Sequence, residues 1–179
     1  MATFGGPAAR LQLMNRAAMV GLLMRCTVNL GVSLIALADP NSLALPPGRW
    51  LLGTLAAWSL YRLLTRSQGT GWLAIDYAAA LVVCLAIPVL APATDFYASN
   101  SAPQAIAGTA VISISVSVSM LAAVPMAVGI AIAYAVGAAT VIGWENLTSV
   151  TALYYFAVQC ATASIIRLML LHVAGAIDR

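Results

Sequence analysis

The chain has 179 residues, of which 63% are hydrophobic and only 7% are charged, and its mean hydropathy is +0.98. Soluble domains carry roughly 25% charged residues, so this composition excludes an ordinary soluble fold and predicts a protein whose exterior is solvated by lipid. The formal net charge of +3 comes from arginines scattered along the chain, a pattern that excludes a nucleic-acid-binding patch.

The apolar runs predict an all-α fold, a polytopic transmembrane helical bundle that forms a single domain after a short lead of residues 1–12. Each span needs about 20 apolar residues, so the chain has room for six spans and short loops. Breaks fall at turn-forming residues such as Asp39 and Pro40, because proline cannot continue a helix and aspartate favours turns. The predicted spans are 15–38, 49–64, 72–91, 104–122, 125–142 and 149–171.

Residues 103–144 form one apolar run that is too long for a single span, so the chain must fold back within it. We expect the break at Pro125. Residues 111–119 alternate with period two, which is typical of a strand. A lone strand in hydrocarbon would leave its backbone groups unpaired, so we expect this segment to be helical.

Small residues on the fourth and fifth predicted spans are spaced four apart. Ser113 and Ser117 share one ridge, and Gly129, Ala133 and Gly137 share another. Small side chains let helix backbones approach closely in membranes. We therefore expect these five positions at helix–helix contacts.

Six spans would place both termini on the same side of the membrane. Arginines gather on that side and acidic residues on the other, so the positive-inside rule predicts cytoplasmic termini in the inner membrane. The predicted cytoplasmic side holds Arg10, Arg16, Arg62, Arg66, Arg167 and Arg179. The opposite side holds Asp39, Arg49, Asp95 and Glu145.

Arg25 is a charged residue inside the first predicted span, where a charge costs at least about 2.5–3.5 kcal/mol on insertion scales. Asn29 follows it at helical spacing. Asp76 in the third span and Arg62 in the second flank a short turn, so we expect them at similar depth and within ion-pair reach of each other or of Arg25. Such a set is either a structural clamp or a bistable switch with a polar pocket.

Other polar residues give weaker signals. Gln159 on the last predicted span is a candidate pocket residue, although it could equally bond across helices. Cys26, Cys84 and Cys160 lie in apolar runs without a metal-binding pattern, so we expect packing roles. His172 is the only histidine and lacks partners for a metal or haem site. We therefore predict no cofactor, no metal and no catalytic residue.

Several charged and aromatic residues occur in a characteristic order along the chain. Arginines surround the first span, Trp58 precedes Arg62 in the second, Asp76 follows Trp72 in the third, and Arg167 closes the last apolar run. This order resembles the N-terminal membrane region of actinobacterial sensor histidine kinases, over most of the chain. The resemblance implies a homodimer whose last span continues as a helix into a kinase core, with a response regulator as a further partner.

The sequence contains no phosphoacceptor histidine motif and no ATP-binding boxes, so we expect no kinase activity from this chain. The leading hypothesis is a sensory or input module that relays a membrane-side signal through its last helix. One alternative is a small accessory or scaffold subunit of a membrane complex. A second is a small transporter component, a class that usually shows broken helices or midplane acidic residues.

Overall fold

The computed structural model describes residues 7–38, 46–91 and 101–177, and it is helical with no strand in these ranges. This confirms the predicted all-α fold, including a helical conformation for the alternating residues 111–117. The helices are α1 (Pro7–Ala38), α2 (Pro47–Thr65), α3 (Thr70–Leu85), α4 (Ile87–Leu90), α6 (Ala102–Ser117), α7 (Met120–Ile142) and α8 (Thr151–Ile177), with a 3-10 helix η1 (Trp144–Ser149) before α8.

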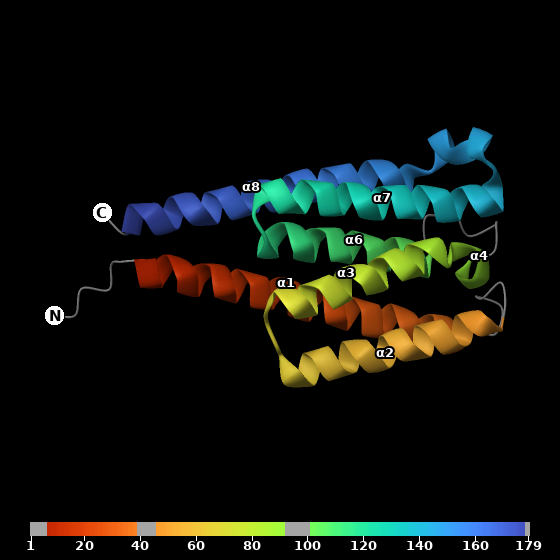
Figure 1. Ribbon diagram of the computed structural model, residues 1–179, viewed down its shortest axis with the longest axis horizontal. Helices are drawn as coiled ribbons and strands as arrows, with labels where there is room; N and C mark the ends of the chain where they lie inside the picture. Colours follow the sequence, from red (N-terminus) through yellow and green to blue (C-terminus); the bar gives the residue numbers. More distant parts are fainter. Residues whose placement is uncertain (1–6, 39–45, 92–100, 178–179) are drawn as a thin grey trace.

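The helices lie side by side in an elongated bundle and alternate in direction (Figure 1). α1 and α2 are antiparallel, α3 and α4 return together, and α6, α7 and α8 follow in alternation. α1 begins and α8 ends at the same end of the bundle, which we name the terminal end; both helices extend beyond the α2–α3 and α6–α7 turns there. Long helices and short turns make neighbours antiparallel.

α6 is the central helix of the bundle, in contact with α1, α3, α7 and α8. Ile114 on α6 and Ile130 and Tyr134 on α7 are completely or almost completely buried, and the Tyr134 ring meets Phe156 of α8 edge-on with centroids 5.1 Å apart. A second buried cluster includes Leu52 of α2. The core therefore lies along α6 and not beneath a single outer helix.

The outer surface is strongly apolar. Leu121 and Trp50 are 89% and 84% exposed, and many other large hydrophobic side chains are open. Three helical segments have the length and composition of membrane spans: Leu11–Ala38, Met120–Ile142 and Thr151–Val173. Apolar exteriors on helices of this length are what a bilayer solvates, which indicates a helical membrane protein.

The break between the fourth and fifth predicted spans was wrongly placed at Pro125. Val118 and Ser119 adopt extended backbone conformations and reverse the chain, and Pro125 lies inside α7. Ser119 is the N-cap of α7, without a side-chain bond to the first turn. Pro125, the sixth residue of α7, has no N–H to donate to the Leu121 carbonyl, yet the helix continues through it.

Other predicted boundaries also shift. α1 begins at Pro7, before the predicted start at residue 15, because proline is well suited to the first turn of a helix. The third predicted span is interrupted at Ala86, since Pro88 has no N–H to donate to the carbonyl of Cys84. The last helix starts at Thr151 and continues to Ile177. The predicted turn at Asp39 lies outside the described residues.

Three of the small residues, Ser113, Gly129 and Gly137, face a neighbouring helix closely. A methyl group added at Gly137 would collide with the Cys84 carbonyl of α3, and one at Gly129 would collide with the Tyr77 hydroxyl. Ala133, on the same ridge, is 7% exposed. A methyl group added at Gly21 of α1 would lie 3.5 Å from Cα of Ser113 on α6, an ordinary van der Waals contact.

Ser117 completes the serine ridge of α6 without being fully buried. Its hydroxyl donates to the Ser113 carbonyl at 2.6 Å, a bond within the helix. Of the two serines, Ser113 is the one that is buried and faces Gly21 of α1.

Gly137→Ala should therefore destabilise the fold, because its new methyl group would meet backbone that cannot move aside. Overpacking of this kind costs about 1–3 kcal/mol. Gly53→Ala is the matched control, since a Cβ there meets nothing within 4 Å. We expect thermal unfolding in detergent to occur at a lower temperature for Gly137→Ala only. Equal melting temperatures for the two variants would contradict the close α3–α7 packing.

Candidate functional site

The turn between α2 and α3 sets the geometry of the site. Arg66 ends α2 in a left-handed conformation, and its N–H donates to the Arg62 carbonyl at 3.0 Å. Gly69 follows with φ of 146°, a conformation that favours glycine. α3 then starts at Thr70. This short reversal brings Arg62, in the last turn of α2, opposite Asp76 in α3.

Asp76 is the acceptor at the centre of the site. Its Oδ2 atom receives hydrogen bonds from Nη2 of Arg25 and from Nη2 of Arg62, the latter at 3.0 Å. Its Oδ1 atom accepts from the Trp58 indole at 2.8 Å. We name these four residues, Arg25, Trp58, Arg62 and Asp76, the Arg–Asp layer. One carboxylate thus joins α1, α2 and α3.

The three charged members of the layer are almost completely enclosed. Arg25, Arg62 and Asp76 are only 3%, 3% and 5% exposed. Pairing and hydrogen bonding offset the large cost of burying each charge. Removal of one partner would leave the others buried without compensation, so the layer strongly constrains how α1, α2 and α3 pack.

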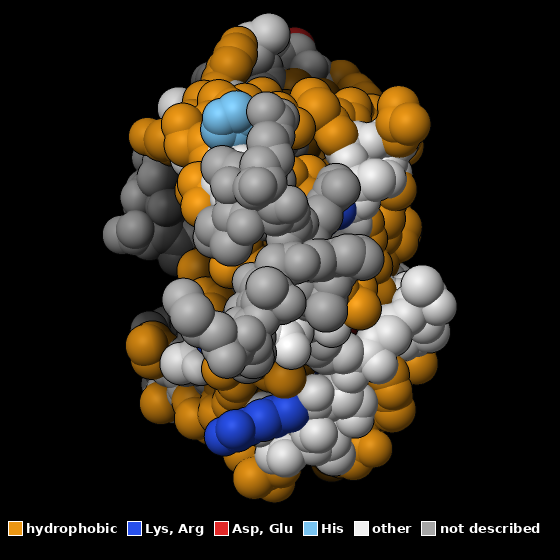
Figure 2. All heavy atoms as spheres, turned by 90° about the vertical axis from the view of Figure 1, so that its left-hand side faces the viewer, with side chains coloured by type: hydrophobic (Ala, Val, Ile, Leu, Met, Phe, Trp, Pro, Cys, Tyr) orange, Lys and Arg blue, Asp and Glu red, His pale blue; other side chains and the backbone are white. Residues whose placement is uncertain are grey.

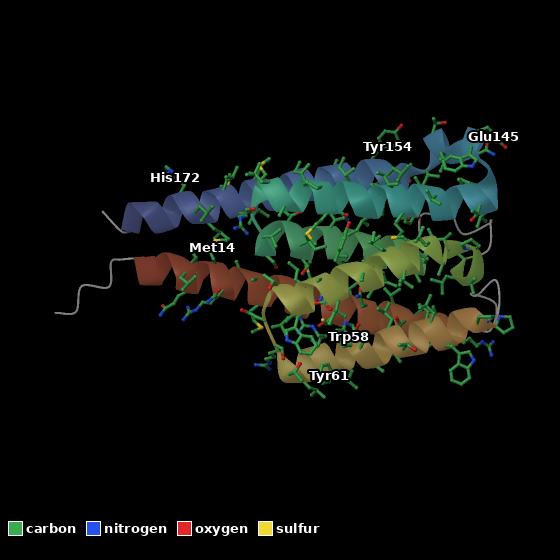
Figure 3. The ribbon with its side chains drawn as sticks, in the orientation of Figure 1. Met14, Trp58, Tyr61, Glu145, Tyr154 and His172 are labelled. Atoms are coloured by element: carbon green, nitrogen blue, oxygen red, sulfur yellow. The ribbon has the colours of Figure 1, made fainter. Side chains whose placement is uncertain are left out.

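Arg62 has additional partners. Its Nη1 atom donates to the Ser67 carbonyl at 2.5 Å, and its guanidinium lies 5.1 Å from the centroid of the Trp72 ring. Trp72 packs against Trp58 and Tyr61, with ring centroids 5.8 and 6.0 Å apart. Figure 3 shows Trp58 and Tyr61 on α2 near its turn into α3. These rings exclude water from one side of the guanidinium.

The layer carries an excess of positive charge, because two guanidinium groups share one carboxylate. Nη1 of Arg25 and Nε of Arg62 are buried and have no hydrogen-bond partner within the described part of the chain. Asp76 already accepts three bonds. Among the described residues, the site therefore offers two unused donors beside a single carboxylate, which suits anion binding or an ion-pair rearrangement.

A cavity of about 450 Å³ lies beside the layer. Arg25, Arg62 and Asp76 form part of its wall, and Ser67, Gln68 and Thr70 from the α2–α3 turn line it as well. Because that turn faces the terminal end of the bundle (Figure 1), the cavity gives the layer a polar approach from this end.

The remaining predicted site residues are not bonded to Asp76, although Asn29 lines a small void together with Asp76 and Arg25. Asn29 is buried one turn from Arg25 on α1, and its Oδ1 accepts from the Thr109 hydroxyl of α6 at 3.3 Å. Gln159 of α8 packs against Gly108 on α6. The predicted set thus separates into a three-residue ionic centre and two residues at α1–α6 and α6–α8 contacts.

Sequence reasoning missed Trp58 as a ligand of the carboxylate and Trp72 as the ring beneath Arg62. A signal for both was present. Trp58 precedes Arg62 by four residues and Trp72 precedes Asp76 by four, and residues at that spacing share one helix face. The Ser67 carbonyl had no such signal, since its position depends on the turn.

No protein-family model, curated protein or solved structure matches the chain. The chemistry of the layer therefore rests on its own geometry.

Asp76→Asn should lower the free energy of unfolding by about 3–5 kcal/mol, the typical cost of stranding a buried partner. Arg25 and Arg62 would both lose their counter-charge. Glu145→Gln is the control, because Glu145 is an exposed residue of η1 at the opposite end of the molecule from His172 (Figure 3). Chemical unfolding in detergent measures both. A loss no greater than that of Glu145→Gln would show that the layer is not a stabilising ion pair.

Proposed function

We propose that the chain is a membrane-embedded input module that relays a signal through α8, as in the sensor histidine kinases that its sequence resembles. The observation that carries this proposal is the Arg–Asp layer. In this layer, one carboxylate shared by two arginines joins three helices. The carboxylate could pair with either arginine, so the layer has more than one possible pairing. Bistable elements of this kind are what switching proteins use.

The proposed topology has six spans with both termini in the cytoplasm. It is supported by the alternating directions of α1, α2, α3 with α4, α6, α7 and α8 (Figure 1). α6 has 16 residues, about 24 Å at 1.5 Å per residue, against a hydrocarbon thickness of about 30 Å. A helix surrounded by four others does not have to match that thickness by itself.

The charge distribution supports the proposed orientation. Arg16 and Arg66 are exposed toward the terminal end, and Figure 2 shows basic side chains among hydrophobic ones on this end of the molecule. Trp50 and Trp144 are exposed near the other end, as interfacial anchors would be. Asp39, Asp95 and Arg179, which also entered the sequence prediction, lie outside the described residues.

A route from the layer to α8 is available through packed helices. α1 carries Arg25 and contacts both α6 and α8. α6 is also held to α8 by Arg167, whose Nη1 donates to the Val116 carbonyl at 2.8 Å. In the proposed mechanism, a change of Asp76 pairing moves α1 relative to α2 and α3, and this displacement reaches α8.

The proposed partners are a second copy of the chain, a kinase core and its response regulator. α8 is the most open of the three long apolar helices: 17% of its apolar window is buried, against 39% for α1. A dimer formed along α8 would use this face. The same open face favours the second candidate function, an accessory or scaffold subunit that docks α8 against another membrane protein.

The topology proposal predicts the location of reporter fusions. A fusion at Gln68 and one after Ile177 should both report a cytoplasmic location, whereas a fusion at Glu145 should report a periplasmic one. Activity of paired phosphatase and fluorescent-protein reporters gives the measurement. A periplasmic result after Ile177 with a cytoplasmic result at Gln68 would rule out the even number of spans.

The relay proposal is tested by joining α8, in helical register, to the core of a sensor kinase and measuring autophosphorylation in vesicles. Asp76→Asn combined with Arg25→Gln should recover part of the stability that Asp76→Asn loses, because one Arg–Asp charge pair is removed as a unit and only Arg62 is left without its counter-charge, while output stays fixed high or low. Arg66→Gln, an exposed change at the same end, should leave output at the parent level. Parental output from the folded double variant would contradict the relay.

A further inference from the structure

The cavity beside the Arg–Asp layer has one acidic lining residue, Asp76, and two cationic ones, Arg25 and Arg62. Both guanidinium groups retain a buried N–H donor without a partner among the described residues, at Nη1 of Arg25 and Nε of Arg62. Neither donor is bonded to Asp76, whose oxygens accept from Nη2 of Arg25, Nη2 of Arg62 and the Trp58 indole. A buried donor without a partner costs about 1–3 kcal/mol and more when charged, so an acceptor that draws these enclosed donors toward the cavity would be favoured.

The rest of the cavity wall adds to its preference for negative charge. Thr70 begins α3 at this wall, and that helix has no acidic residue in its first turn and no side-chain cap. The N-terminus of a helix carries a partial positive charge and free N–H groups. Ser67 and Gln68 supply further polar atoms at the mouth. The helix end and the buried arginines are independent features that point in the same direction.

We propose that this cavity binds a phosphate oxyanion, held by Arg25 and Arg62 and entering from the terminal end past the α2–α3 turn. The excess positive charge of the layer disfavours a cation. The planar, multi-donor guanidinium matches the oxygens of a phosphate group, which accepts several hydrogen bonds at once. The phosphate is either that of an anionic lipid headgroup or a free ion, because both present the same chemistry to the two arginines.

This inference deepens the proposed function and rests on it only for the role of the bound ligand. In that role, the oxyanion would be the signal that changes the pairing of Asp76. A phosphate that competes for Arg25 or Arg62 weakens that arginine's bond to the carboxylate. The occupied and empty states would then differ in how firmly α1 is held to α3. Binding itself can be measured without any kinase core.

The chain offers its own spectroscopic probe. Trp58 bonds to Asp76 and Trp72 lies beneath Arg62, whereas Trp50 and Trp144 are exposed outside the layer. A full-length parent with Trp50→Phe and Trp144→Phe therefore reports fluorescence from the site alone. It would be studied in nanodiscs of phosphatidylcholine titrated with inorganic phosphate at constant ionic strength. A second series would replace phosphatidylcholine stepwise with phosphatidylglycerol.

We expect a saturable change of tryptophan emission in at least one series. Saturation with inorganic phosphate alone identifies a free ion, and saturation with phosphatidylglycerol alone identifies a headgroup. Arg25→Gln should weaken binding by about tenfold, as the loss of a charge-assisted bond implies. Asp76→Asn should strengthen it, because the competing carboxylate charge is gone. Arg66→Gln, outside the cavity lining, should bind as the parent does.

If Arg25→Gln does not fold, Arg25→Lys replaces it: lysine retains the charge beside Asp76 but loses the planar fork, and it should also bind more weakly. No saturable change in either series would overturn the proposal. Parental binding by the folded Arg25 variant, or weaker binding by Asp76→Asn under conditions where it remains folded, would overturn it as well. Oxyanion binding that leaves the output of the kinase fusion unchanged would retain the site and refute the sensory function.

Discussion

The packing of α1, α2 and α3 depends on one carboxylate buried between two guanidinium groups. Asp76 holds Arg25 and Arg62 inside an apolar bundle, where neither arginine could remain without a counter-charge at acceptable cost. Few backbone approaches join α2 to α3, and long side chains such as Trp58 and Trp72 bridge the gap between them. Because the ion pairs require fixed geometry, they specify the depth at which the three helices meet.

Two kinds of contact hold the helices of the bundle together. Along α6 and α7, small residues let backbones approach so closely that an added methyl group at Gly137 would strike the Cys84 carbonyl. That carbonyl lies four residues before Pro88, which cannot donate a hydrogen bond to it. α1 also packs closely along α2 and α6. In addition, the Arg–Asp layer joins α1, α2 and α3 through polar side chains beside a cavity.

Much of this organisation could be predicted from the sequence, because hydropathy and charge dominate in an apolar chain. The depth match across a short turn was enough to pair Arg62 and Asp76, and four-residue spacing was enough to find Gly129 and Gly137. The break at Ser119 could not be found from apolar runs, because Ser117 and Ser119 at the turn continue the alternating serines of α6 and do not stand out as a polar break. The Trp58 bond and the cavity depend on how α2 and α3 face each other, and hydropathy carries no information on that angle.

A double-mutant cycle on Asp76→Asn and Arg25→Gln tests most directly whether the layer constrains the helices as a coupled unit. Free energies of unfolding would be measured in detergent for the parent, both single variants and the double variant. If the layer is a coupled unit, the double variant loses less stability than the sum of the single losses, by about 1–3 kcal/mol, as contacting charged partners do. Losses that add within about 0.5 kcal/mol would contradict it, because Arg25 and Asp76 would then act independently.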